Sequence, residues 1–225
     1  MKMGIIIPWR RTDSRASAFT KTIARLSDQF PDSTIYCADK PGERFSSSGA
    51  RNRGCLEAIQ DDCDILLVVD ADMLLEKEAV EKAIEKAERF GSVCLPYNSL
   101  SRMNLELSTS LINNEVSFEE IKTDSRGEIT LSQIGGAYVM TSSTFLRLNG
   151  WDERFVGWGF EDDAFAAAHM AIVGKTLDKV QGYAATFYHE DRDQESIEEN
   201  RQRYYSYLNK TQNEMLDIVK GNRDG

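Results

Sequence analysis

Short apolar runs alternate with amphipathic segments through the first hundred residues of the chain. The apolar runs predict buried strands over residues 3–8, 34–38, 64–70 and 92–97. Apolar residues recur at helical spacing over residues 15–29, 50–60 and 76–90, and Gly91 ends the last of these helices. Strands that alternate with helices in this way predict right-handed βαβ units, and therefore an α/β fold with a mostly parallel sheet flanked by helices.

The second half of the chain has a weaker pattern. The stretch 98–133 has no clear period, and we expect a mobile loop within it. Further strands are predicted over 136–141 and 183–188, and further helices over 143–149 and 161–173. The remaining C-terminal residues are polar and predict one or more helices with a frayed tail.

The charge balance argues against one broad class of partner. The chain has 37 acidic and 27 basic residues and a formal net charge of −10, which disfavours tracking of a nucleic-acid backbone. A local basic patch formed by Arg10, Arg11 and Arg15 is compatible with this balance. An acidic protein that holds an anionic ligand would usually recruit a cation for the task.

The lengths of the apolar runs and the spacing of the cysteines indicate the cellular compartment of the protein. No apolar run approaches the roughly 20 residues of a membrane helix, and the N-terminal MKMGIIIPWRR has too short an apolar stretch for a signal peptide. The four cysteines are Cys37, Cys55, Cys63 and Cys94. Since they form no CxxC pair, we expect free thiols in a reducing compartment, and a soluble cytoplasmic protein.

Each of the first three predicted strands ends in residues that include a charged side chain. These are Pro8, Trp9 and Arg10 after the first strand, Asp39 after the second, and Asp70, Ala71 and Asp72 after the third. Ligands of parallel sheets bind at the carboxyl ends of the strands. The convergence of these residues on one edge of the sheet therefore indicates a binding site more strongly than any one motif does.

The acidic pair in VVDADM is a candidate metal site. Asp70 and Asp72 flank a small residue where a buried strand emerges. Carboxylates at this spacing suit Mg²⁺ or Mn²⁺ that is also bound by a diphosphate. A solvated turn after a strand would have the same sequence, so the triplet alone does not decide between the two.

Three consecutive acids, Glu161, Asp162 and Asp163, open the helix predicted over 161–173. One or two acids would suffice to offset the helix dipole. A third adds like-charge repulsion, which raises the pKa of at least one carboxyl group and suits a general base. The helix N-terminus favours the charged carboxylate and lowers the same pKa.

Just before these acids, Trp158 stands between two glycines. Its indole either offers a stacking surface to a sugar ring or packs in the core, as most tryptophans do.

Two further segments carry weaker signals. In YHEDRD, His189 follows a predicted strand and could join a carboxylate and a phosphate oxygen around Mn²⁺, although a lone histidine is more often structural. His169 lies among alanines, where we expect packing. In SSSGARNRG, Arg51, Asn52 and Arg53 stand at a helix start. They could hold a phosphate or a base edge, or be surface residues of a capped helix.

Taken in order, five segments resemble the GT-A-fold glycosyltransferases, especially the β-1,4-galactosyltransferase and polypeptide N-acetylgalactosaminyltransferase groups. They are IIIPWR (5–10), GARNRG (49–54), VVDADM (68–73), GGAYVMTSSTFLRLNGWDERFVGWGFEDD (135–163) and YHEDRD (188–193). The glycine pair, NGWDE and WGFEDD are specific at this spacing. The resemblance implies a GT-A domain over 1–193, with a nucleotide-binding half (1–97) and an acceptor and catalytic half (98–193), and a helical extension over 194–225.

The resemblance also implies roles for individual residues. Ten would bind the nucleotide-sugar donor: Pro8, Trp9, Arg10, Asp39, Arg51, Asp70, Ala71, Gly135, Gly136 and Trp158. Of these, Arg51 would lie near the base or the diphosphate, and the glycine pair would allow close backbone approach to the donor sugar. Trp158 would stack on the donor or on the acceptor. Asp72 and His189 would ligate Mn²⁺ (or Mg²⁺). Glu161 would orient a hydroxyl group, and Asp162 would be the catalytic base.

The implied reaction is metal-dependent transfer of a sugar from a nucleotide sugar, expected to be a UDP-sugar, to an acceptor hydroxyl group with inversion. The acceptor is open among a glycan, a lipid, a protein and a small molecule, and a nucleic acid is the weaker candidate. Phe160 replaces a glycine of the galactosyltransferase pattern GWGGEDD and should reshape the donor-sugar or acceptor pocket. Golgi members carry a membrane anchor and stem; we expect this chain to lack both, which points to a bacterial or viral source.

Three other classes of protein stay open. A non-catalytic nucleotide-sugar-binding protein would bind the donor without turnover. A nucleotidyltransferase of related topology would need a glycine-rich phosphate loop near the N-terminus, and IIIPWRRTDSR contains no glycine. A metal-dependent phosphoester hydrolase would show no preference for a nucleotide sugar. It would use Asp70, Asp72, His189 and Asp191.

Overall fold

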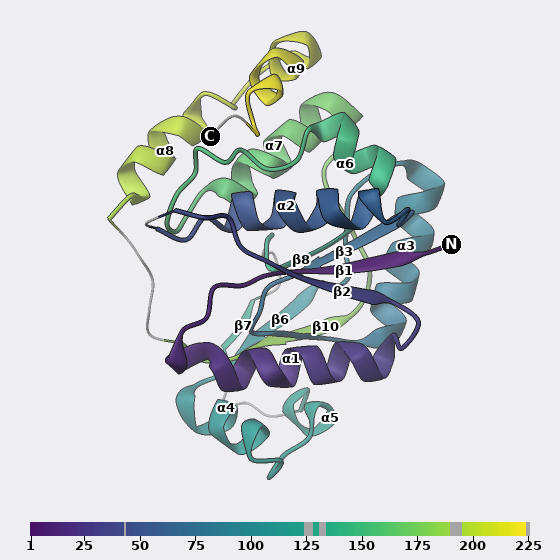
Figure 1. The fold of residues 1–225 in the computed structure, drawn as a ribbon, viewed down its shortest axis with the longest axis vertical. Helices are drawn as coiled ribbons and strands as arrows, with labels where there is room; N and C mark the ends of the chain where they lie inside the picture. The colour runs from purple at the N-terminus through teal and green to yellow at the C-terminus, as the bar shows by residue number, and fades with distance from the viewer. Residues whose placement is uncertain (43, 124–127, 131–133, 190–194, 224–225) are drawn as a thin grey trace.

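The computed structural model describes residues 1–42, 44–123, 128–130 (backbone alone), 134–189 and 195–223. Its centre is a six-stranded sheet with the order β2-β1-β3-β8-β5-β9 (Figure 1). In chain order the strands are β1 (Met3–Pro8), β2 (Thr34–Ala38), β3 (Ile65–Val69), β5 (Cys94–Leu95), β8 (Ala137–Thr141) and β9 (Asp178–Lys179). Only β8 pairs antiparallel with its neighbours β3 and β5, and the other pairs in this sheet are parallel. The predicted α/β fold with a mostly parallel sheet is confirmed.

The central strands β1 and β3 are buried on both faces. Residues 4–8 of β1 and all five residues of β3 are buried, which accounts for their continuous apolar sequences. Most of β2, at the edge of the sheet, is partly exposed. The bounds of β1 and β2 agree with the predicted strands because an apolar run between polar turns leaves little choice of end points.

Three helices of the first half cover the sheet. α1 (Ala16–Gln29) and α2 (Ser47–Gln60) lie on opposite sides of the strands, and α3 (Lys77–Phe90) packs along β8 and β5 (Figure 1). α2 begins earlier than predicted because Ser46 caps it, its side chain accepting a hydrogen bond from the Gly49 amide at 3.1 Å. Gly91 ends α3 in the left-handed conformation (φ 56°), as predicted.

A second sheet of four strands was not predicted. Its order is β4-β10-β6-β7, with β4 (Met73–Leu75), β6 (Ser99–Arg102), β7 (Glu128–Thr130) and β10 (Tyr183–Thr186). With α4 (Leu105–Ile112) and α5 (Phe118–Ile121), it makes most of the described part of 98–133 regular structure rather than loop; residues 124–127 and 131–133 of that stretch lie outside the description. These elements enclose a second small core that includes Leu107, Phe118, Ile121, Tyr183 and Phe187.

The C-terminal helices pack against the rest of the chain. α6 (Ser142–Leu148) and α7 (Glu161–Val173) match their predicted positions, and α8 (Ile197–Tyr205) and α9 (Gln212–Lys220) contact α7 (Figure 1). Tyr207, Met215 and Val219 are members of the main core. The division of the chain at residue 193 stays a prediction. Within the described ranges, every helix is too short or too polar to cross a membrane.

His169 of α7 is a core residue, as the packing interpretation predicted. Its ring is fully buried; Nε2 accepts a hydrogen bond from the Val93 amide at 3.0 Å, and Nδ1 lies 3.0 Å from the Lys175 carbonyl oxygen, to which it must donate. Burial lowers the pKa of His169 to about 4, so the ring is neutral at pH 7. The four cysteines are free thiols, as expected, with Cys37 exposed and the others buried.

Candidate active site

The pairing of β4 with β10 brings Asp72 and His189 together. In this antiparallel ladder Met73 faces Thr186, and the Phe187 amide donates to the Asp72 carbonyl oxygen at 2.9 Å. Just beyond the ladder, Asp72 Oδ2 lies 3.3 Å from His189 Nε2. On the other side of the ring, His189 Nδ1 lies 3.1 Å from Nη2 of Arg15.

Arg51 of α2 is a buried cation between two carboxylates. Its Nη1 donates to Asp162 Oδ1 at 2.7 Å and its Nη2 to Asp70 Oδ1 at 2.9 Å, and its side chain is 2% exposed. The guanidinium also lies 5.4 Å from the Trp151 ring centre and 5.8 Å from that of Tyr138. Burial alone lowers the pKa of Arg51, but the charges of Asp162 and Asp70 outweigh it and raise the pKa well above its usual value.

The two carboxylates that Arg51 joins come from different parts of the fold. Asp70 follows β3, and Asp162 lies in the first turn of α7. The interpretation of surface arginines on a capped helix is therefore wrong for Arg51. It holds for Arg53, whose side chain is 54% exposed and pairs with Glu57 one turn along α2.

The glycine pair lies between these two acids. Gly135 and Gly136 have φ values of 111° and 77°, which only glycine adopts readily. The Gly136 carbonyl oxygen accepts from the Asp70 amide at 2.8 Å. A Cβ on Gly135 would overlap the Asp162 carboxylate, and one on Gly136 would lie 2.9 Å from Met73 Sδ. Gly135 therefore allows the Asp162 carboxylate to approach the backbone, and Gly136 makes room for the Met73 side chain.

Burial raises the pKa of several carboxyl groups at the site. The pKa of Glu161 rises to about 7 through burial and then through the charge of Asp162. The pKa of Asp163 rises for the same two reasons. Partial burial raises the pKa of Asp70 to about 6, against the opposing charge of Arg51. The expectation that at least one of the three consecutive acids has a raised pKa is confirmed, with burial as the larger cause.

Arg10 and Asp39 form a two-pronged ion pair at the ends of β1 and β2. Arg10 Nε lies 2.8 Å from Asp39 Oδ2 and Nη2 lies 3.1 Å from Oδ1. Trp9 donates its amide to the Ala38 carbonyl oxygen at 2.8 Å and stacks on Phe19 of α1, with ring centres 4.1 Å apart. The ends of β1 and β2 thus converge as predicted. Arg10 pairs there with Asp39, the acid expected near the nucleotide base.

Trp158 and Phe160 lie in the loop before α7 and have different surroundings. Trp158 is 41% exposed, so the core-packing alternative does not apply to it; Trp151 is the fully buried tryptophan. Phe160 stacks on Tyr204 of α8, with ring centres 5.7 Å apart. Any influence of Phe160 on a sugar pocket therefore includes its contact with α8.

Three residues complete the site without having been assigned to it from the sequence. The Tyr97 hydroxyl donates to the Gly135 carbonyl oxygen, and Tyr138 is buried against Arg51. Nothing in the sequence separates these tyrosines from ordinary core residues, because both lie in or beside buried strands. Arg15 was noted only as part of a basic patch, and the structure places it on His189.

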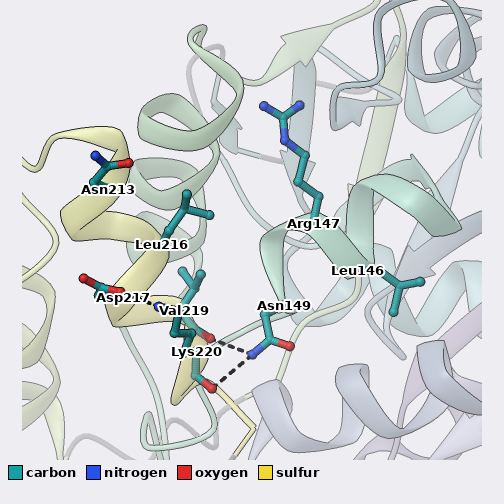
Figure 2. A pocket seen from close by; sticks show the side chains of 8 residues that line it. All are labelled: Leu146, Arg147, Asn149, Asn213, Leu216, Asp217, Val219 and Lys220. Carbon is teal, nitrogen blue, oxygen red and sulfur yellow. Dashed lines mark hydrogen bonds and ion pairs between the residues drawn. The ribbon is translucent and has the colours of Figure 1, made fainter.

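Two hollows on the described surface lie away from these residues. The larger, of about 630 Å³, lies between α6 and α9 and is lined by Leu146, Asn149 and Leu216, among others (Figure 2). Asn149 donates there to the Val219 carbonyl oxygen at 2.6 Å. The second hollow, of about 380 Å³, lies along α2. The second is lined by Arg53, a candidate phosphate or base contact, and neither is lined by the residues expected to bind the donor, the metal or the acceptor.

The Asp72–His189 pair fits a divalent cation that also binds a diphosphate. Two ligands about 2.1 Å from one ion, at right angles, lie about 3 Å apart, close to the 3.3 Å between Oδ2 and Nε2. Among the described residues, no group of three or more His, Cys, Asp or Glu side chains could hold an ion. Mg²⁺-like ions commonly take one or two protein carboxylates and complete their shell with substrate phosphates and water. Asp191, a ligand in the hydrolase alternative, lies outside the described residues.

Comparisons with known proteins bear on the fold. A family model described as the N-terminal domain of galactosyltransferase matches residues 118–190, less than half of the chain. No curated protein matches the sequence.

Solved structures match over nearly the whole chain. The catalytic domain of Drosophila β1,4-galactosyltransferase 7 in complex with xylobiose is 16% identical, with 96% of this chain and 83% of that chain covered and a TM-score of 0.60. A mutant of that enzyme in complex with manganese, UDP-Gal and xylobiose is 14% identical over the same shares, with a TM-score of 0.58. S. aureus TarS in complex with UDP-GlcNAc is 13% identical, with 97% and 70% covered and a TM-score of 0.54. The resemblance predicted from the sequence is confirmed, and the chain has the fold of the GT-A glycosyltransferases.

Proposed function

We propose that this protein is a metal-dependent glycosyltransferase that transfers a sugar from a UDP-sugar to an acceptor hydroxyl group with inversion. The observation that carries the proposal is the Arg51 bridge, which holds Asp70 and Asp162 on one guanidinium at 2.9 and 2.7 Å. Asp70 belongs to the strand edge expected to bind the donor, and Asp162 to the acids expected to act on the acceptor. Their fixed separation supports a site where both substrates meet.

The donor would lie along the carboxyl ends of β1, β2 and β3. Arg10 and Asp39 would be available to the nucleoside, and Asp70 and the backbone at Ala71 to the ribose or sugar. The backbone at Gly135 and Gly136 would lie against the donor sugar. The choice of uridine is supported by the UDP-Gal and UDP-GlcNAc bound in the similar structures.

Asp72 and His189 would hold the divalent cation, as their 3.3 Å separation supports. When bound, such an ion acts as a Lewis acid that stabilises the charge of a departing diphosphate. A structure with this fold contains manganese, which makes Mn²⁺ the first choice.

Asp162 is the proposed general base. It would take the proton of the acceptor hydroxyl group as the hydroxyl oxygen attacks the anomeric carbon, while the bond from that carbon to the diphosphate oxygen breaks and UDP leaves with the electron pair. A single displacement of this kind inverts the anomeric centre. Glu161, with a pKa raised to about 7, would orient the hydroxyl group, and Trp158 would offer its partly exposed indole to the acceptor ring. Xylobiose in a similar structure supports a saccharide acceptor.

A thermal-shift panel of UDP-sugars, with Mn²⁺ or with a chelator, tests the proposal. A ligand present at 100 times its Kd stabilises the folded state by about 2.7 kcal/mol, so the correct donor should raise the melting temperature only when Mn²⁺ is present. Turnover with that donor is then sought on saccharide acceptors. Donor binding without turnover on any acceptor would favour the binding-protein alternative. Phosphoester cleavage without donor preference would favour the hydrolase.

A further inference from the structure

Helix α8 packs against the loop that carries Trp158 and leads into Glu161 and Asp162. The contact centres on Asn200, whose side chain is almost fully buried, with the residue 2% exposed. Asn200 Nδ2 donates to the Val156 carbonyl oxygen at 3.1 Å and to the Trp158 carbonyl oxygen at 3.4 Å. One side-chain amide thus joins two backbone positions of the loop, and a buried donor in this place stabilises only a loop that presents both carbonyl groups to it.

Phe160, at the end of the same loop, has a backbone conformation that requires outside support. Its φ of 68° lies in the left-handed region, which is unfavourable for a bulky side chain. The Phe160 ring stacks on Tyr204 with an angle of 19° between the planes, and the Arg201 guanidinium lies 5.6 Å from the ring centre. Both partners belong to α8. The stack therefore offsets the backbone strain and fixes the turn into α7.

The start of α8 is also tied to the nucleotide-binding half of the chain. Arg44 Nη1 donates to Ser196 Oγ at 2.7 Å, and Ser196 is buried. A Cβ placed on Gly159 would lie 3.6 Å from Ile197 Cγ1, so the helix backs directly onto the loop. α8 therefore contacts the loop through several residues along the helix, and Ser196, just before the helix, is bonded to Arg44, just before α2.

We propose that α8 is a built-in support of the acceptor site, with Asn200 and Tyr204 as positioning residues. They hold the loop 156–160 in one conformation, with Trp158 partly exposed in the turn that leads into Glu161 and Asp162, before any donor binds. Such pre-organisation lowers the entropic cost of binding an acceptor sugar. The inference rests on the proposed function for the identity of the ligand, but the conformational statement stands on the contacts of α8 alone.

Fluorine NMR of protein labelled with 5-fluorotryptophan tests the support in the whole chain. The chain has three tryptophans, and Trp158→Phe assigns the signal of Trp158. We expect one sharp Trp158 signal without ligand, and a broadened or split signal in Asn200→Ala, with the Trp9 and Trp151 signals unchanged. Gln202→Ala is the matched control, because Gln202 lies on the same helix, is exposed and bonds to Glu198. An unchanged Trp158 signal in Asn200→Ala would overturn the proposal.

A second variant keeps the test decisive if Asn200→Ala perturbs the whole protein. Phe160→Gly removes the ring while relieving the left-handed strain, so it should keep the fold and still broaden the Trp158 signal; a sharp signal would refute the role of the stack.

Titration with UDP and Mn²⁺ separates this inference from the proposed function. Equal UDP affinity in wild type and Asn200→Ala agrees with a role confined to the acceptor loop, and a matching loss of UDP affinity contradicts it. Absence of UDP binding in the wild type, with the NMR result as expected, would refute the function and leave the support standing.

Discussion

Arg51 Nη1 lies 2.7 Å from Asp162 Oδ1, although 111 positions of the sequence separate the two residues. The same guanidinium reaches Asp70 Oδ1 at 2.9 Å. A planar group with fixed donors sets the distance between the two carboxylates, which a flexible ammonium group would not do. The separation between the donor-side acid and the proposed base is therefore determined by one buried side chain.

Loss of the Arg51 side chain should destabilise the protein strongly. Arg51→Met leaves two carboxylates beside a buried apolar group, and removal of one partner of a buried ion pair costs about 3–5 kcal/mol. Arg51→Lys keeps the positive charge but loses the two-pronged guanidinium group. Its free energy of unfolding should therefore lie between that of Arg51→Met and that of the wild type. Urea unfolding measures both. Arg53→Met is the control, because its exposed pair with Glu57 contributes about 1 kcal/mol at most.

A double variant checks that the loss comes from the ion pairs. Arg51→Met combined with Asp162→Asn removes one of the orphaned charges and should recover part of the stability lost in Arg51→Met. Strict additivity of the two single changes would mean that Arg51 and Asp162 do not interact.

Asp162→Asn should abolish most turnover while donor binding persists. Asparagine can still accept a hydrogen bond from Arg51, but it cannot take a proton, and general-base catalysis contributes about 10²–10⁴-fold. Single-turnover transfer with the donor found by thermal shift measures the loss. Asp163→Asn, the adjacent acid, should retain activity. If Asp162→Asn stays active while Glu161→Gln loses this factor, Glu161 is the base and the assignment is reversed.

Mn²⁺ binding should depend on Asp72, on His189 and on UDP. With two protein ligands, the wild type should bind Mn²⁺ weakly alone and more tightly with UDP, because the diphosphate supplies further oxygens. Asp72→Ala and His189→Ala should each weaken Mn²⁺ binding in the presence of UDP by about tenfold or more, as measured by calorimetry. Asp217→Ala on α9, 73% exposed, should not. Unchanged titrations for both variants would refute the ligand assignment.

The sequence predicts what depends on local pattern and misses what depends on distant pairing. β1 and α7 are found because one is a continuous apolar run and the other begins with acids and ends at Gly174. β4 and β6 are missed because they have only three and four residues, and each becomes a strand through pairing with β10, far along the chain.

The same distinction applies to the site. The Asp72–His189 pair is expected from the family resemblance, and the β4–β10 ladder explains its formation. No spacing rule links Arg51 to Asp162, since their contact depends on how α2 and α7 pack. The stacking partner of Phe160 cannot be predicted from the sequence either, because Tyr204 lies in a C-terminal helix whose own sequence is mostly polar.

Glu161→Gln should stabilise the protein at alkaline pH. The pKa of Glu161 rises from 4.5 to about 7 on folding, so its contribution to stability is fully present below about 4.5 and is lost as the pH rises through about 7. Removal of the charge should raise the free energy of unfolding at about pH 8 by at most about 3 kcal/mol and change it little at about pH 4. Urea titrations at both pH values measure this, with exposed Glu198→Gln as the control. An equal effect at both pH values would contradict the assigned burial.

His169 should make the protein less stable as the pH falls, whereas Glu161 makes it less stable as the pH rises. Burial lowers its pKa from 6.5 to about 4, so its contribution is present above about 6.5 and is lost as the pH falls toward about 4. His169→Gln should be less stable than the wild type at pH 7, because it replaces a packed ring. This difference should shrink by up to about 3 kcal/mol as the pH falls to about 4.

The two titrations oppose each other between about pH 4.5 and 6.5, and variants separate them. Over this range Glu161 makes the wild type less stable as the pH rises, while His169 makes it more stable, so these two contributions should largely cancel. Asp70, with a pKa raised from 3.8 to about 6, acts in the same direction as Glu161 and should leave the wild type less stable as the pH rises. Glu161→Gln should uncover the acid sensitivity caused by His169, and His169→Gln should uncover the alkaline sensitivity caused by Glu161. The double variant should keep the wild-type slope. If both single variants keep the wild-type slope, neither residue titrates in the folded state as its burial requires.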